Sequence, residues 1–351
     1  MKERIDRLRG ELDALAAGSF LASNPVNVRY LTGFDSSNAF VLVKHKEVLL
    51  FTDGRYIEAA RGVEGVEAVL VEREFAHGVA RVLPDLADGP VAFEADHLTY
   101  GRHERLAATG LELVPTNGIL VRLRAVKDPG ELEEIRRAAR ILDDTYELLA
   151  GEKIVGRSER EVAWWFEQAL REQGAHALAF DVTVASGPNA ALPHHHTGDR
   201  TIGSGETVVV DAGAKVDGYC SDCTRTVATG ALPAELRRAY AVCRAAQESS
   251  LAEVRRGADA RSLDGIARRE LEAAGFEVLH GLGHGVGLEV HELPVLRSTA
   301  DGALEPRNVV TVEPGVYLPG HGGVRIEDLV IVTEGGAEVL TPFTKELVTL
   351  D

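Results

Sequence analysis

The sequence predicts an α+β protein in which a small mixed α/β domain, residues 1–122, precedes a larger domain, residues 123–351, built from an antiparallel sheet and helices. A chain of 351 residues with 45% hydrophobic composition can bury a full core and is long enough for two domains. Short apolar runs alternate with helical stretches in the first part, whereas helices are grouped against hairpins in the second.

The first domain is expected to begin with an amphipathic helix, because apolar residues from Ile5 to Leu15 recur at helical spacing. Short apolar runs bounded by Gly, Asp or Asn then predict strands at 20–22, 39–43 and 48–52. Helix-like stretches lie between such runs up to about residue 120.

Two helix start signals open the second domain. Asp128 can cap a helix with Pro129 at its first position and Glu131 as the capping-box partner, and Ser158 with Glu161 repeats the pattern. These signals predict helices that run toward residues 151 and 174. Strands are then predicted at 182–185, 207–210, 220–228, 309–312 and 329–332, with helices at 233–256 and 260–274.

Composition excludes several classes of protein. The formal net charge of −17 repels phosphate backbones, so we expect no nucleic-acid partner. The apolar runs are much shorter than the roughly 20 residues that span a bilayer, and the charged residues 1–10 contain no apolar signal core. We therefore expect a cytoplasmic protein without a membrane partner.

The cysteines leave alternatives open. Cys220, Cys223 and Cys243 are an odd number and do not make a secreted disulfide framework. Cys220 and Cys223 form a C-x-x-C that could be a redox pair or half of a zinc site. The simpler interpretation is that both are small residues of a strand.

Four carboxylates occupy equivalent places in two predicted hairpins. Asp211 ends a valine run and Asp222 returns on the other side of a turn, so the two can lie almost opposite each other. Glu313 and Glu327 repeat this arrangement around a glycine-rich turn. Because facing carboxylates repel and are costly to bury alone, the pattern predicts more than one bound cation.

His284 is the fifth candidate ligand. It lies among Gly281, Gly283, Gly285 and Gly287, which allow the backbone to approach a site closely. One imidazole with four carboxylates makes an oxygen-rich site that suits manganese, cobalt or zinc. The residues alone thus predict two divalent metal ions.

The motifs that carry these residues resemble those of the prolidase and aminopeptidase P family, which shares the pita-bread fold with methionine aminopeptidase. Asp-x-Gly, Ser-Asp-x-Thr-Arg-Thr, Gly-x-Gly-His-Gly-x-Gly, Glu-Pro-Gly-x-Tyr and Arg-Ile-Glu-Asp occur in family order. Residues 24–34 and 52–56 also resemble the family's creatinase-like N-terminal domain. The resemblance covers nearly the whole chain.

This resemblance implies a metallopeptidase that cleaves the Xaa-Pro bond of short peptides. Asp211 and Asp222 would hold one metal ion, Asp222 and Glu327 would bridge to the second, and His284 and Glu313 would complete it. The ions would activate a shared water, and Glu313 would move its proton.

The resemblance also assigns further residues of the site. His194 would stabilise the tetrahedral intermediate and His291 would contact the substrate near the scissile bond. His280 and Tyr317 match residues of the pocket, and Arg325 matches an arginine that pairs with the carboxylates of the site. His195 and His196 have no assignable role.

The sequence is compatible with more than one substrate length and assembly. Arg55 could bind a substrate carboxylate, or could be a surface arginine at a helix start. A homodimer is the common default for such a chain. The alternatives are a methionine aminopeptidase-like enzyme, which normally lacks the first domain, a creatinase, which lacks the metals, and a non-catalytic binding protein of the same fold.

Overall fold

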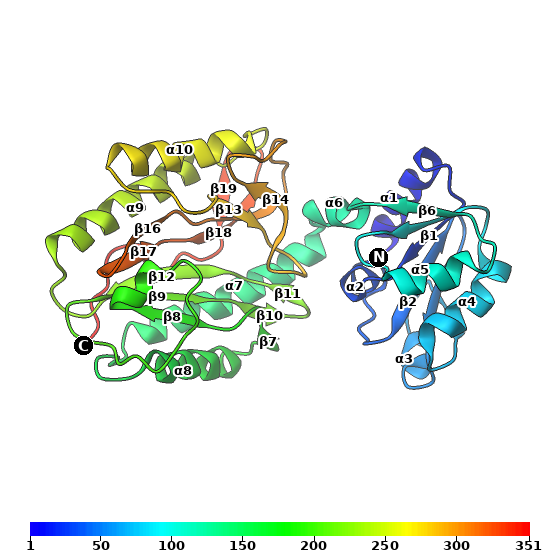
Figure 1. The fold of residues 1–351 in the computed structure, drawn as a ribbon, viewed down its shortest axis with the longest axis horizontal. Coiled ribbons are helices and arrows are strands. Elements are labelled where there is room, and N and C mark those ends of the chain that lie inside the picture. The colour runs from blue at the N-terminus through cyan, green and yellow to red at the C-terminus, as the bar shows by residue number, and fades with distance from the viewer. The chain divides into compact units, whose positions relative to one another are not determined.

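The computed structural model describes residues 1–351 and consists of two compact units, Met1–Arg124 and Ala125–Asp351. Figure 1 shows that helices and strands are mixed in both units. None of the helices has the length and apolar character needed to cross a bilayer. The α+β class predicted from the sequence is confirmed.

The first unit contains a six-stranded sheet with the order β4-β3-β2-β1-β5-β6. Its strands are β1 (Ser19–Ala22), β2 (Ala39–Lys44), β3 (Val48–Thr52), β4 (Glu67–Leu70), β5 (Val91–Glu94) and β6 (Leu113–Thr116). Strand β2 pairs antiparallel with β1 and β3, and the other pairs are parallel. The three strands predicted here are therefore confirmed.

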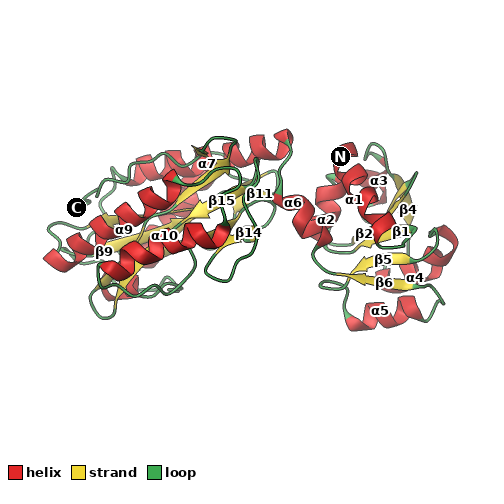
Figure 2. Ribbon diagram, turned by 90° about the horizontal axis from the view of Figure 1, so that it is seen from above, coloured by secondary structure: helices red, strands yellow, loops and turns green.

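Helices lie on both faces of this sheet (Figure 2). They are α1 (Lys2–Ala14), α2 (Pro25–Thr32), α3 (Ile57–Arg61), α4 (Phe75–Leu86) and α5 (Tyr100–Ala107), and α6 (Ile119–Ala125) follows the last strand of the sheet. Ile5, Leu8 and Leu12 are buried along α1, as their spacing predicted.

The second unit carries four long helices. They are α7 (Pro129–Leu149), α8 (Glu159–Glu172), α9 (Ala234–Ala252) and α10 (Ala260–Ala273). Both predicted capping boxes, Asp128 with Glu131 and Ser158 with Glu161, are present at the starts of α7 and α8. Helix α9 ends four residues before the predicted Arg256, because Glu253 and Val254 turn back onto the last carbonyls of the helix.

The strands of this unit form four small sheets rather than one. The first group is β7 (Ala177–Leu178), β8 (Thr183–Ser186), β9 (Thr207–Ala212), β10 (Ala214–Val216), β11 (Tyr219–Cys220) and β12 (Cys223–Ala228). The second group is β13 (Gly283–Gly285), β14 (Glu292–Leu296), β15 (Val309–Val312), β16 (Gly315–Leu318), β17 (Gly322–Arg325), β18 (Asp328–Val332) and β19 (Ala337–Val339). The sheet orders are β11-β10-β7, β12-β9-β8, β14-β13-β15-β18-β19 and β16-β17.

Two separate cores hold these layers together. Residues of α7 and α8 pack with β8, β9 and β12, whereas residues of α9 and α10 pack with β15, β16, β17 and β18. In Figure 1, α9 and α10 lie along one side of the strands and α7 and α8 along the other. Each half thus consists of a helix pair and a long hairpin, and the strands between the helix pairs carry the candidate ligands.

The predicted strand 220–228 is wrong in one respect, because it is interrupted at Ser221 and Asp222. The backbone N–H of Ala214 donates to Ser221 Oγ at 3.0 Å, and Ser221 Oγ donates to the Ala138 carbonyl of α7 at 3.1 Å. The Ser221 hydroxyl therefore takes the place of a backbone acceptor in the strand ladder. The interruption separates the β9–β12 ladder from the β10–β11 ladder and leaves Asp222 between them.

Candidate metal centre

The first hairpin positions Asp211 and Asp222 on neighbouring strands. Asp211 pairs with Thr224 in the β9–β12 ladder, so Asp222 lies diagonally from it, two residues before its partner. A Cβ on Gly213, next to the interruption, would lie 2.2 Å from the Ser221 carbonyl oxygen, so only glycine fits there. At the tip, Asp217 and Gly218 both have positive φ, as a two-residue hairpin turn requires.

Glu313 and Glu327 lie in the second hairpin, in the gap between the β15–β18 ladder and the β16–β17 ladder. The pairing register of the first ladder continues into the second. Val312 pairs with Asp328 on one side of the gap, and Gly315 pairs with Arg325 on the other. Residues 313 and 327 therefore occupy opposite positions. The two glutamates face each other as the sequence predicted.

His284 reaches the same place from β13. Its Nε2 lies 3.3 Å from Glu313 Oε1 and 3.5 Å from Asp222 Oδ2. Its Nδ1 lies 3.1 Å from the Gly285 carbonyl oxygen, and this contact fixes the ring so that Nε2 faces the carboxylates. An imidazole that donates one N–H to a backbone carbonyl is typical of metal-binding histidines.

Asp222, His284 and Glu327 offer ligand atoms that all lie within 4.8 Å of one another. Buried oxygens of two of the carboxylates, Asp211 Oδ1 and Glu327 Oε1, accept no hydrogen bond. Buried polar atoms are almost always paired, so acceptors without donors indicate a cation as their partner. The residues therefore fit a metal centre.

The electrostatics of the cluster also favour a bound cation. Burial, followed by the charges of neighbouring carboxylates, raises the pKa of Asp222 and of Glu327 well above the ordinary carboxyl value. Burial lowers the pKa of His284, but the hydrogen bond and charge of Glu313 outweigh it and raise that pKa to about 9. The cluster attracts positive charge and takes up protons when no other cation is supplied.

Arg325 is the hub of the polar contacts around these ligands. Its Nη2 donates to Asp211 Oδ2 at 2.6 Å, and its Nε donates to Thr224 Oγ1 at 3.0 Å. Thr224 Oγ1 in turn donates to Glu327 Oε2 at 2.7 Å. One buried cation thus orients a carboxylate of each hairpin, one directly and one through Thr224.

The same arginine connects to the predicted pocket residues. Arg325 Nη1 donates to Tyr317 Oη at 3.3 Å, and Tyr317 Oη lies 2.8 Å from His280 Nε2. Arg325 Nη1 also donates to the carbonyl of Pro193 at 3.3 Å. The segment that carries His194 is therefore held to the ligand network at its backbone.

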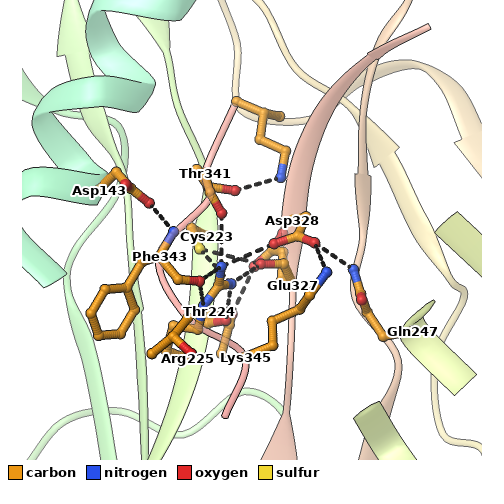
Figure 3. A network of polar contacts seen from close by, with 12 residues as sticks. Asp143, Cys223, Thr224, Arg225, Gln247, Glu327, Asp328, Thr341, Phe343 and Lys345 are labelled. Carbon is orange, nitrogen blue, oxygen red and sulfur yellow. Dashed lines mark hydrogen bonds and ion pairs between the residues drawn. The ribbon is translucent and has the colours of Figure 1, made fainter. Parts of the chain in front are cut away.

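A second buried arginine, Arg225, lies beside Glu327 and Asp328 (Figure 3). Its guanidinium donates to the Glu327 carbonyl and, at 2.9 Å, to Asp328 Oδ1. Asp328 Oδ2 accepts from Lys345 Nζ at 2.6 Å and from Gln247 Nε2 at 2.9 Å. This network joins β12 and β18 to the C-terminal segment, where Arg225 also donates to the carbonyls of Thr341 and Phe343.

A cleft of about 410 Å³ opens over the ligands and is of the size that small-molecule sites have. The structure brings together in its lining all the predicted site residues except Arg55. These are His194, Asp211, Asp222, His280, His284, His291, Glu313, Tyr317, Arg325 and Glu327. The rings of His284 and His291 lie 4.4 Å apart, and burial, then the charge of His284, lowers the pKa of His291.

Sequence reasoning missed several residues of the site. Phe180, Val290 and Val295 form apolar parts of the cleft, and Arg297 adds an exposed cation to it. Thr224 could have been found, because it lies in the same motif as Asp222. The apolar residues carry no signal, since their spacing is that of ordinary strand or loop residues.

Arg55 and the cysteine pair have other surroundings. Arg55 belongs to the first unit, where its Nη2 pairs with Asp53 Oδ2 at 2.8 Å, so its binding of a substrate carboxylate stays a prediction. Cys220 and Cys223 are buried free thiols, and burial raises the pKa of Cys220 to about 11. No cysteine belongs to the cluster of candidate ligands. Both thiols are core residues beside the centre.

Comparison with known proteins gives similarity over the whole chain. The model of metallopeptidase family M24 matches residues 133–334, and that of the creatinase/prolidase N-terminal domain matches residues 4–126. The Xaa-Pro dipeptidase of Pyrococcus furiosus is 33% identical over 352 residues, which cover 99% of this chain and 100% of that protein.

Solved structures of similar proteins have the same fold in both units. An Xaa-Pro dipeptidase from Bacillus anthracis superposes with a TM-score of 0.95 at 37% identity and covers 99% of both chains. An X-Pro aminopeptidase from Thermotoga maritima superposes with a TM-score of 0.91 at 32% identity, covering 99% of this chain and 100% of that one.

Proposed function

The chain belongs to metallopeptidase family M24 and is an Xaa-Pro metallopeptidase with a pita-bread catalytic unit, and from this premise we propose that five side chains of the cleft hold two divalent metal ions. The five are Asp211, Asp222, His284, Glu313 and Glu327. The observation that carries the proposal is the cluster of Asp222, His284 and Glu327, whose ligand atoms lie within 4.8 Å of one another, together with the buried oxygens of Asp211 and Glu327 that have no donor.

Charge balance supports two ions rather than one. Four carboxylates converge in the cleft, and Arg325 is the one arginine that pairs directly with any of them. The negative charge that remains is larger than a single divalent ion neutralises, and buried charge without a partner is strongly disfavoured. A second ion removes the excess.

The donor set limits the choice of metal. Carboxylate oxygens and one imidazole nitrogen suit manganese, cobalt or zinc, and the two buried thiols do not take part. When bound, such ions polarise the substrate carbonyl and activate water near neutral pH.

Side chains of the cleft carry out the proton transfer, contact the substrate and stabilise the intermediate. In the metal-free protein, burial raises the pKa of Glu313, but its contact with His284 outweighs burial and lowers that pKa. During hydrolysis Glu313 would accept a proton from the attacking water and return it to the leaving nitrogen. His291, with its lowered pKa, is neutral near pH 7 and donates a hydrogen bond to the substrate next to the scissile bond. His194 stabilises the oxygen of the tetrahedral intermediate.

This division of labour suits a bond to proline. The nitrogen of an Xaa-Pro bond carries no hydrogen, so a site that must bind that N–H cannot use it. The cleft acts on the carbonyl and supplies a proton to the nitrogen only as it leaves. The chemistry explains why such a bond can be cleaved, and the similarity to Xaa-Pro dipeptidases supports the substrate: dipeptides or short peptides with proline in the second position, from which the first residue is released.

The proposal is tested with purified protein and three peptides. Ala-Pro and Ala-Pro-Ala are expected to be cleaved, with activity lost after chelation and restored by manganese, cobalt or zinc. Metal analysis is expected to give two ions per chain. Release of methionine from Met-Ala peptides with no cleavage before proline would instead indicate an enzyme like methionine aminopeptidase.

The ratio of the two proline substrates resolves the length preference. A predominance of Ala-Pro cleavage would identify a dipeptidase, and a predominance of Ala-Pro-Ala cleavage an aminopeptidase. We also propose that the protein is cytoplasmic. We further propose that it is a homodimer, and light scattering of the purified protein tests this oligomeric state. Replacing Arg55 by Ala raises KM for Ala-Pro if that residue binds the carboxylate of the substrate.

A further inference from the structure

Glu159, outside the catalytic cluster, is completely buried at the first turn of α8. Its Oε1 accepts from the backbone N–H and the hydroxyl of Ser186, both at 2.8 Å, and from Asn189 Nδ2 at 3.0 Å. Its Oε2 lies 2.8 Å from His195 Nε2. A carboxylate of this helix start thus binds three residues that flank the position of His194.

Backbone contacts fix the far end of the same segment. The N–H of Glu159 donates to the Arg200 carbonyl at 3.0 Å, and the N–H of Arg160 donates to the Gly198 carbonyl at 2.9 Å. The segment from Ser186 to Arg200 is therefore held against the start of α8 at both ends and at its middle.

His194 and His195 are neighbours in sequence with different surroundings. His194 is exposed and lines the catalytic cleft, whereas the His195 side chain is only 11% exposed and contacts Glu159. His196 is exposed and does not line the cleft. The three adjacent histidines are therefore distinguished by their contacts.

The negative charge of Glu159 strengthens its hydrogen bonds to the segment that carries His194. Burial raises the pKa of Glu159, but the hydrogen bonds from Ser186, Asn189 and His195 together outweigh burial and lower it. The carboxylate is then ionised at neutral pH and His195 Nε2 carries the proton of the contact. A charged acceptor makes stronger hydrogen bonds than a neutral one, and the helix N-terminus also favours negative charge.

We propose that Glu159 and His195 are positioning residues that fix the place of His194 in the catalytic cleft. The inference rests on the proposed role of His194 in hydrolysis. Glu159 acts through His195 on the backbone of the segment, so its removal displaces a group that has to meet the substrate with sub-ångström accuracy.

The first test replaces the contact and keeps the fold. His195→Asn is too short to reach Glu159 and is expected to lower kcat for Ala-Pro between roughly 10-fold and 100-fold, with little change in KM. His195→Gln, whose amide nitrogen reaches the place of Nε2, is expected to retain most of the activity. His196→Asn is the matched control and is expected to behave as the wild type.

The second test asks whether the effect passes through His194. In a double-mutant cycle with His194→Ala, the loss caused by His195→Asn or Glu159→Gln is expected to disappear, because there is no longer a group to position. Metal content and melting temperature are measured for every variant, and the metal content is expected to stay at the wild-type value.

Two results would overturn the inference while the proposed function stands. Either His195→Asn has full activity although His194→Ala is impaired, or the losses of the two variants multiply in the double mutant. A normal rate for His194→Ala would remove both the proposed role of His194 and the inference. Failure of the wild type to cleave Ala-Pro or Ala-Pro-Ala would instead count against the function itself.

Discussion

Thr224 and Glu327, 103 residues apart in the sequence, are joined by a hydrogen bond of 2.7 Å from Thr224 Oγ1 to Glu327 Oε2. The same hydroxyl accepts from Arg325 Nε. It therefore connects the two hairpins and leaves Glu327 Oε1 available to a cation.

Replacing Thr224 by Val is expected to weaken metal binding roughly 10-fold, as loss of a group that orients a metal ligand commonly does. The substitution keeps the shape but removes the donor to Glu327 and the acceptor of Arg325. Competition with a chelating dye measures the affinity. Thr145→Val also removes a buried hydroxyl, one that donates to the Ile141 carbonyl within α7 and contacts none of the ligands, so it is the control and is expected to bind metal normally.

Asp222→Asn is expected to abolish detectable hydrolysis of Ala-Pro and to lower the metal content, because the predicted bridging carboxylate becomes a neutral amide. Elemental analysis and a peptide-cleavage assay measure the two effects. Asp217→Asn makes the same change of charge at the exposed tip of that hairpin and is expected to leave both unchanged. Normal turnover by a two-metal Asp222→Asn protein would refute the ligand assignment.

The stabilisation provided by metal is expected to increase with pH. The raised pKa values of Asp222 and Glu327 mean that the folded metal-free protein retains protons that the unfolded chain has released. Its stability therefore falls as the pH rises from the ordinary carboxyl pKa of about 4 toward the raised values. Bound ions remove this penalty and displace the protons.

Calorimetry tests this pH dependence. The increase in melting temperature on adding Mn²⁺ is expected to be larger at about pH 8 than at about pH 5, and titration in buffers of different ionisation enthalpy is expected to detect released protons. A constant increase across this range, with no proton release, would contradict the assignment.

Asp328→Asn is expected to destabilise the protein by about 3 kcal/mol, because Arg225 and Lys345 would lose the carboxylate between them in a buried environment. Denaturant unfolding measures the free energy. Glu338→Gln breaks the partly exposed pair with Arg136 and is the control, with an expected loss below about 1 kcal/mol. Equal losses in both variants would show that burial of the Arg225 network has no special effect.

The local parts of this architecture could be predicted from the sequence. The capping boxes at Asp128 and Ser158 mark helix starts because their partners lie three residues away. Glu313 and Glu327 could be expected to face each other because a single turn sets the register between them.

The remaining features depend on contacts between distant segments. The interruption at Asp222 depends on the contact of Ser221 with Ala138 of α7, which no local pattern contains. The contact of His195 with Glu159 likewise joins a loop to the start of a helix 36 residues earlier. Periodicity and turn residues report on neighbours in the chain, so such partners appear only in the folded structure.

The placement of the ligands on two hairpins also determines when the centre can form during folding. Asp211 and Asp222 belong to the half built on α7 and α8, whereas Glu313 and Glu327 belong to the half built on α9 and α10. Contacts between such distant segments form late, because long loops must close before they are made. A chain emerging from the ribosome therefore cannot assemble the ligand set until Glu327 has been synthesised, and metal uptake reports that both halves have come together.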